Sequence, residues 1–204
     1  AADYDDDVRD EQNPIRTGYE ACLTWVAEQA VLTADKTVLE LGSGTGNLTT
    51  RLPTYKHLTC LDVSPKMMAV AKTKLDNLDN VKFVEADVLE YLHNSPDPVD
   101  VIVSTYTLHH LTKPEKETFL TLVKDSLNPG GRLVVGDLMV ESEDDCQERI
   151  RHYQNLGNED AAESLAEEFF WRLDSTIDVI ERLELAYDLT QFSDLSYGLL
   201  VKKS

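Results

Sequence analysis

The chain has 204 residues, 42% of them hydrophobic and 28% charged, which is enough to bury the core of one domain. Its 38 Asp and Glu against 19 Lys and Arg give a net charge of -19, which repels phosphate backbones and anionic lipids. The composition therefore argues against nucleic acid and membrane partners, and the acidic start, where a signal peptide would be basic and then apolar, favours a cytoplasmic protein, which we expect to be a monomer or homodimer.

The first predicted element is a helix over residues 13–32. Asn13 followed by Pro14 is typical of a helix cap and first turn, and the apolar residues after them recur at helical spacing. From residue 37 onward, short apolar runs alternate with helical patterns; the runs cover residues 37–41, 58–62, 81–86, 99–104 and 132–138. This alternation predicts parallel strands joined by crossover helices, as in a doubly wound α/β sheet.

The remainder of the chain has a different pattern. Residues 141–182 carry amphipathic stretches rich in Glu and Ala, which predict two or three helices. The last two apolar runs, 183–192 and 196–204, are separated by a short connection, which predicts an antiparallel pair of strands. We therefore expect residues 1–204 to form a single domain.

The turn after the first predicted strand, ELGSGTGN, holds three alternating glycines, Gly42, Gly44 and Gly46. Glycine takes positive φ angles and lets a ligand approach without meeting a β-carbon, whereas a plain tight turn needs one or two glycines. In a doubly wound sheet this turn is the usual place for a nucleotide. Asp62 ends the second predicted strand 20 residues beyond Gly42, where a carboxylate suits the two hydroxyls of a ribose. The sequence therefore predicts a ligand that contains a nucleoside.

Two classes of ligand compete for such a turn. A dinucleotide fingerprint has the spacing GxGxxG, and its last glycine is replaced by Asn47 here. The spacing present is GxGxG, preceded by Glu40, while an acid in the place of Asp62 is common to both classes. A nicotinamide-linked oxidoreductase is therefore the disfavoured alternative, and the sequence also lacks a Tyr-x-x-x-Lys pair.

Five segments in order resemble the motifs of the class I S-adenosylmethionine-dependent methyltransferases, in their bacterial small-molecule branch of the methyltransferase type 11/25 kind. They are VLELGSGTGNLT, LDVSPKMMAVAKTKL, VKFVEADVLEY, VDVIVSTYTLHHLTKPEK and LNPGGRLVV, and the resemblance covers nearly the whole chain. It implies a Rossmann-like doubly wound sheet of seven strands, mostly parallel with an antiparallel C-terminal strand. It also implies transfer of a methyl group from S-adenosylmethionine to a small-molecule acceptor, with S-adenosylhomocysteine as the product.

The resemblance also implies a role for each matching position. The backbone from Gly42 to Gly46 would lie against the methionine part of the cofactor, with Glu40 steadying the turn or the ammonium group. Asp62 would bind the ribose hydroxyls, and the residues that follow it would pack near the adenine. The implied cofactor residues of the first two motifs are Glu40, Gly42, Ser43, Gly44, Gly46, Asp62, Val63 and Met67. For Met67, ordinary helix packing is the alternative.

The later motifs contribute the remaining implied cofactor contacts. Asp87, with its neighbours Ala86 and Val88, would meet the adenine amino group, and capping of a loop is the alternative for Asp87. Ser104, at the end of the fourth strand, would lie beside the methionine moiety. Tyr4 would cover the cofactor, although an acidic run such as DYDDD is more often a solvated tail.

No motif identifies the acceptor. The fourth strand is followed by STYT, not by the Asn/Asp-Pro-Pro-Tyr/Phe element that in related families holds a planar amide or base nitrogen. The sequence also has no Pro-Cys pair, which would offer a thiol for methylation of cytosine at carbon 5. Both absences argue against methylation of nucleic acid. The acceptor atom, whether O, N, C or S, stays open, and residues 141–180 are expected to form a helical cover over the substrate side. A protein that binds S-adenosylmethionine and regulates a partner without methylating it is the second alternative.

His109 and His110 are the candidate catalytic residues. They follow the fourth predicted strand, and in the resembling enzymes a histidine before a hydrophobic residue often faces the substrate here, which matches His110. An imidazole with a pKa of about 6.5 can accept a proton or orient the acceptor, while capping of the next helix is the alternative. No metal is expected, because adjacent side chains diverge and no third His or Cys follows at ligand spacing.

Overall fold

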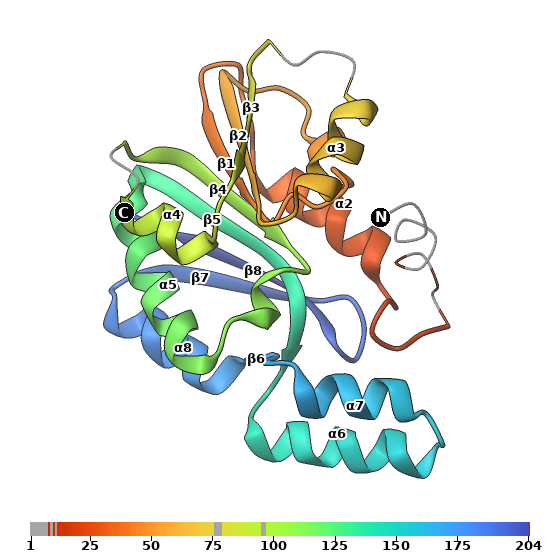
Figure 1. Ribbon diagram of the computed structural model, residues 1–204. Coiled ribbons are helices and arrows are strands. Elements are labelled where there is room, and N and C mark those ends of the chain that lie inside the picture. The colour runs from red at the N-terminus through yellow and green to blue at the C-terminus, as the bar shows by residue number, and fades with distance from the viewer. Residues whose placement is uncertain (1–7, 9, 11, 76–78, 95–96) are drawn as a thin grey trace.

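The computed structural model describes residues 8, 10, 12–75, 79–94 and 97–204, and the account below concerns these residues (Figure 1). A single sheet runs through them in the order β3-β2-β1-β4-β5-β8-β7, with the short β6 paired to β5 outside this path. The strands are β1 (Thr37–Leu41), β2 (His57–Asp62), β3 (Val81–Glu85), β4 (Val99–Thr105), β5 (Leu127–Val140), β6 (Trp171–Arg172), β7 (Ala186–Gln191) and β8 (Ser196–Lys202).

Strand direction follows the predicted pattern. The pairs β1–β2, β1–β4, β2–β3, β4–β5 and β5–β6 are parallel, and β8 is antiparallel to both β5 and β7. The predicted α/β fold, with a mostly parallel sheet and an antiparallel C-terminal strand, is confirmed. The two-residue β6 was not predicted, because so short a segment leaves no alternation to detect.

Helices cover both faces of the sheet, which explains why its central strands are apolar in consecutive positions. In Figure 1, α2 and α3 lie on one side of the sheet and α4, α5 and α8 on the other, while α6 and α7 pack together beyond β6. The helices are α2 (Tyr19–Gln29), α3 (Pro65–Lys74), α4 (Val88–Asn94), α5 (Lys113–Ser126), α6 (Glu143–Asn155), α7 (Glu159–Glu167) and α8 (Leu173–Arg182).

Residues 141–182 form the predicted helices, which are α6, α7 and α8. Local signals set several helix starts: Ser64 Oγ accepts a hydrogen bond from the Met67 amide, and Thr112 and Glu115 form a capping box. No helix of the described ranges is long and apolar enough to span a bilayer.

The predicted start of the first helix is wrong. The helix begins at Tyr19, not at residue 13, because Gly18 has a φ of +85° and cannot continue a right-handed helix. A β-carbon on Gly18 would lie 3.0 Å from Cβ of Phe192, so a contact from the far end of the chain helps to fix this conformation. The Asn13 side chain instead accepts a hydrogen bond from the Ile15 amide within a preceding turn.

Candidate functional site

The glycine turn joins β1 to the short 3-10 helix η1 (Thr49–Arg51). All three glycines have positive φ, with +67° at Gly42, +53° at Gly44 and +84° at Gly46. A β-carbon at Gly42 would lie 2.1 Å from Oγ1 of Thr107, whereas one at Gly44 would meet no atom within 4 Å. The bare backbone at Gly42 therefore lets the segment after β4 approach, and the space at Gly44 is open for a ligand.

Asp62 holds this turn against the end of β2. One carboxylate oxygen accepts a hydrogen bond from the Gly44 amide at 2.7 Å, and the other accepts one from the Ser64 amide at 2.8 Å. Each carboxylate oxygen has two lone pairs, so both can still accept a bond from a ligand hydroxyl. The carboxylate thus has a fixed orientation and spare acceptor capacity.

A cavity of about 290 Å³ lies along this turn, and we call it the turn cavity. Its walls include Ser43, whose buried Oγ has no hydrogen-bond partner among the described residues. Such an orphaned polar atom is rare in a folded protein and is consistent with a ligand that bonds to it. The lining residues are Tyr19, Gly42, Ser43, Gly44, Thr45, Asn47, Leu48, Asp62, Val63, Ser64, Met67, Thr105, Tyr106, Thr107 and His110.

Three implied cofactor residues, Glu40, Gly46 and Ser104, are not among the residues found to line the turn cavity. Glu40 is fully buried and accepts a hydrogen bond from Thr49 Oγ1 at 2.7 Å, and burial raises its pKa to about 7. Gly46 packs against Ala71 of α3, where a β-carbon would approach to 3.0 Å. Ser104 is buried and donates a hydrogen bond to the Leu41 carbonyl at 2.8 Å. Glu40 on β1 and Ser104 on β4 therefore support the turn from the sheet, and Gly46 lets it pack closely against α3.

The implied residues after β3 are also absent from the described lining of the turn cavity. The Asp87 carboxylate accepts hydrogen bonds from the amides of Leu89 and Glu90 at 2.8 and 3.0 Å, so it caps the start of α4. Ala86 is half-buried and Val88 is buried on the α4 face of the sheet. Tyr4 lies outside the described residues.

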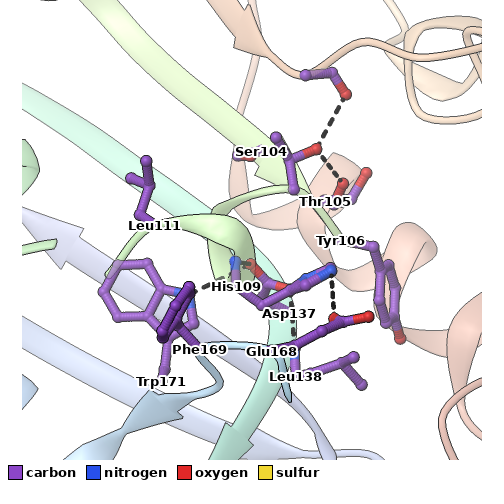
Figure 2. Close-up of polar contacts among 12 residues, drawn as sticks. Ser104, Thr105, Tyr106, His109, Leu111, Asp137, Leu138, Glu168, Phe169 and Trp171 are labelled. Carbon is purple, nitrogen blue, oxygen red and sulfur yellow. Dashed lines mark hydrogen bonds and ion pairs between the residues drawn. The ribbon is translucent and has the colours of Figure 1, made fainter. Parts of the chain in front are cut away.

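His109 is buried in the 3-10 helix η2 (Leu108–His110) and lies between two carboxylates, as Figure 2 shows. Its Nδ1 is 2.6 Å from Oδ1 of Asp137, and its Nε2 is 3.1 Å from Oε2 of Glu168. Burial alone would lower the pKa of His109, but the two carboxylates outweigh it and raise the pKa above the usual value. Asp137 also accepts a bond from Trp171 Nε1 at 3.2 Å, which fixes its orientation.

His110 is exposed, unlike the buried His109, and lines two cavities. Partial desolvation of its ring, followed by the charge on His109, lowers the pKa of His110. The second cavity, of about 230 Å³, shares the lining residues Tyr106 and His110 with the turn cavity, and we call it the histidine cavity. Its lining residues are Asn13, Ile15, Arg16, Tyr106, His109, His110, Leu138, Asp160, Ser164 and Glu168.

Sequence reasoning missed two important contributors to this site. Tyr106, in the STYT segment, has a φ of +46°, unusual for a bulky residue, and its hydroxyl is 2.6 Å from Ser196 Oγ. Tyr106 lies directly after β4, and ligands of such sheets bind at the carboxyl ends of the parallel strands. This position was the available signal. Glu168 follows α7, and no local pattern connects it with the histidine pair 59 residues earlier.

Comparison with known proteins finds methyltransferases both by sequence and by structure. A family model described as a methyltransferase domain matches residues 38–131. An uncharacterized methyltransferase of Geobacillus kaustophilus is 33% identical over 84% of this chain and 75% of that protein, and one of Oceanobacillus iheyensis is 32% identical over 98% and 92%. The N-methyltransferase NodS of Bradyrhizobium japonicum, solved with S-adenosylhomocysteine, has a TM-score of 0.65 at 19% identity, covering 96% of this chain and 90% of that one. The structural likeness establishes a shared fold.

Proposed function

The chain belongs to the S-adenosylmethionine-dependent methyltransferases, and we propose that it transfers the methyl group to a small molecule held in the histidine cavity. The observation that carries this proposal is that the turn cavity and the histidine cavity share Tyr106 and His110 in their walls. A donor in the first and an acceptor in the second would lie next to each other, and alignment of the two reactants is the main demand of methyl transfer.

The residues of the turn cavity fit the methyl donor of this family. The bare backbone at Gly44 leaves room for a ligand group to approach closely. The Ser43 hydroxyl can form a hydrogen bond with the ligand, and the Asp62 carboxylate can still accept hydrogen bonds from ribose hydroxyls. Val63 and Met67 add an apolar wall for the adenine. When bound, S-adenosylmethionine supplies a methyl group already activated by its sulfonium. The chain's own task is therefore to orient the two reactants and exclude water.

Two observations support a small acceptor. The histidine cavity is about 230 Å³, and α7 contributes Asp160 and Ser164 to its wall, in agreement with a helical cover over residues 141–180. The net charge of -19 also disfavours nucleic acid, because it repels phosphate.

His110 is the residue best placed to act on the acceptor. Its lowered pKa keeps the imidazole neutral at neutral pH, so one ring nitrogen can accept a proton from an acceptor group. His109 is buried behind it, with its Nδ1 engaged by Asp137, and we assign it a positioning role.

The test is methyl transfer from isotopically labelled S-adenosylmethionine to a library of hydroxyl, amine, thiol and activated-carbon acceptors. We expect transfer to at least one acceptor, with loss of transfer in Asp62→Ala and retention in Asp125→Ala, whose carboxylate is exposed on α5. Tight cofactor binding without transfer to any acceptor would favour the regulatory alternative. No cofactor binding at all would overturn the proposal.

A further inference from the structure

The structure gives the histidine pair a third potential metal ligand, which the sequence did not reveal. One ligand atom from each of His109, His110 and Glu168 lies within 4.8 Å of the other two. The two imidazole rings are 4.1 Å apart between centroids and tilted by 56°. Adjacent side chains were expected to diverge, but the tight 3-10 turn brings these two together.

One of the distances between these ligand atoms already matches the ligand–ligand distance around a bound Zn²⁺ ion. Zn²⁺ takes nitrogen and oxygen ligands at about 2.0–2.2 Å in a tetrahedron, which separates neighbouring ligand atoms by about 3.3 Å. The His109 Nε2 to Glu168 Oε2 distance is 3.1 Å, so this pair already has the required separation. His110 is exposed, so its ring has room to turn toward the other two.

His109 is oriented as metal-binding histidines are. Metal-ligating imidazoles usually donate their other ring N–H to a carboxylate, which fixes the tautomer and the ring plane. Here Asp137 is 2.6 Å from Nδ1, which leaves Nε2 directed at Glu168 (Figure 2). Asp137 is in turn held by Trp171, and it also accepts a bond from the His109 amide at 3.0 Å.

The chain also fixes Glu168 relative to η2. The amide of Phe169, the next residue, donates a hydrogen bond to the His109 carbonyl at 3.1 Å. Lys116 of α5 donates bonds to the carbonyls of both Leu111 and Phe169. These contacts join the segment after α7 to η2, so the three potential ligands are held close together by the fold.

We propose that His109 Nε2, His110 and Glu168 bind one divalent transition-metal ion of the Zn²⁺ class at the border of the two cavities. Three protein ligands leave a fourth position open, which is the arrangement of catalytic zinc sites. All three residues line the histidine cavity, so the open position faces the proposed acceptor.

The role of the ion rests on the proposed function. A hydroxyl or thiol acceptor at the open position would lose its proton to solvent more readily, because the metal lowers its pKa. The acceptor atom then forms a bond to the methyl carbon as the carbon–sulfur bond breaks, and the sulfur keeps the electron pair. With the ion bound, His110 acts as its ligand, and this role replaces the proton-accepting role given to His110 in the metal-free chain.

Calorimetric titration of the chelator-treated full chain with Zn²⁺, without S-adenosylmethionine, tests the site. We expect one ion per chain in wild type, and affinity at least about tenfold weaker in His110→Ala and in Glu168→Gln. Glu167→Gln, at an exposed neighbouring carboxylate, is the matched control and should bind Zn²⁺ as wild type does. Co²⁺ in the same site should give the intense visible bands of tetrahedral coordination.

Two outcomes would overturn the inference. One is the absence of stoichiometric Zn²⁺ binding, and the other is equal Zn²⁺ affinity in wild type and the two site variants, with the folding of each protein checked by circular dichroism. Separate titration with S-adenosylhomocysteine distinguishes the two proposals: if that ligand binds and Zn²⁺ does not, the metal site is refuted while methyl transfer is unaffected.

Discussion

Gly42→Ala should destabilise the protein more than Gly44→Ala, although both glycines have positive φ. An L-residue in the left-handed region costs about 1–2 kcal/mol, and this cost applies at both positions. At Gly42 the new β-carbon would also lie 2.1 Å from Oγ1 and 2.2 Å from Cγ2 of Thr107, which adds an overpacking cost of about 1–3 kcal/mol. We therefore expect losses of about 2–5 kcal/mol for Gly42→Ala and about 1–2 kcal/mol for Gly44→Ala.

Urea unfolding followed by tryptophan fluorescence measures both free energies. Because the clash involves Thr107 down to its Cβ, at 2.6 Å, the change Thr107→Gly should recover the steric part in a double-mutant cycle with Gly42→Ala. Gly44→Ala combined with Thr107→Gly should show no such coupling. Equal losses for the two alanine variants, or no coupling between positions 42 and 107, would refute the reasoning.

Three further predictions concern the cofactor and acceptor groups. Asp62→Ala should weaken S-adenosylhomocysteine binding more than tenfold, since a hydrogen bond to a charged group contributes about 1.5–3 kcal/mol; unchanged affinity by calorimetry in a folded variant would contradict it. Glu40 has a pKa raised from 4.5 to about 7 in the folded state, so its ionisation should lower stability by about 3 kcal/mol as the pH rises through that window. Glu40→Gln should lack this loss, and parallel pH profiles of the unfolding free energy for the two proteins would disprove the assignment. His110→Ala should lower turnover with cofactor affinity nearly intact, and His109→Ala should be milder; full activity of His110→Ala in steady-state assays would remove His110 from the mechanism.

The features that the sequence predicted well are those encoded by neighbouring residues. The strand β1, the glycines after it and Asp62 at the end of β2 each follow from a local apolar run or a fixed spacing, and parallel strand ends necessarily meet at one edge of a sheet. Six implied cofactor residues line the turn cavity for this reason: Gly42, Ser43, Gly44, Asp62, Val63 and Met67.

The features that were missed depend on contacts between distant segments. The start of α2 is set partly by Phe192 against Gly18, which no window around residue 18 contains. Glu168 reaches His109 through the path of the two helices α6 and α7 after β5, and a sequence pattern cannot specify that path. A motif also cannot tell whether a polar side chain faces a cavity or the backbone, as Ser104 shows with its bond to the Leu41 carbonyl.

The most direct test of the central claim is a crystal structure of the complex with S-adenosylhomocysteine. We predict that the ribose hydroxyls lie within hydrogen-bond distance of the Asp62 carboxylate, with the homocysteine along Gly42 and Gly44 and its sulfur toward His110. A ligand bound elsewhere on the molecule, with the turn cavity empty, would contradict the account.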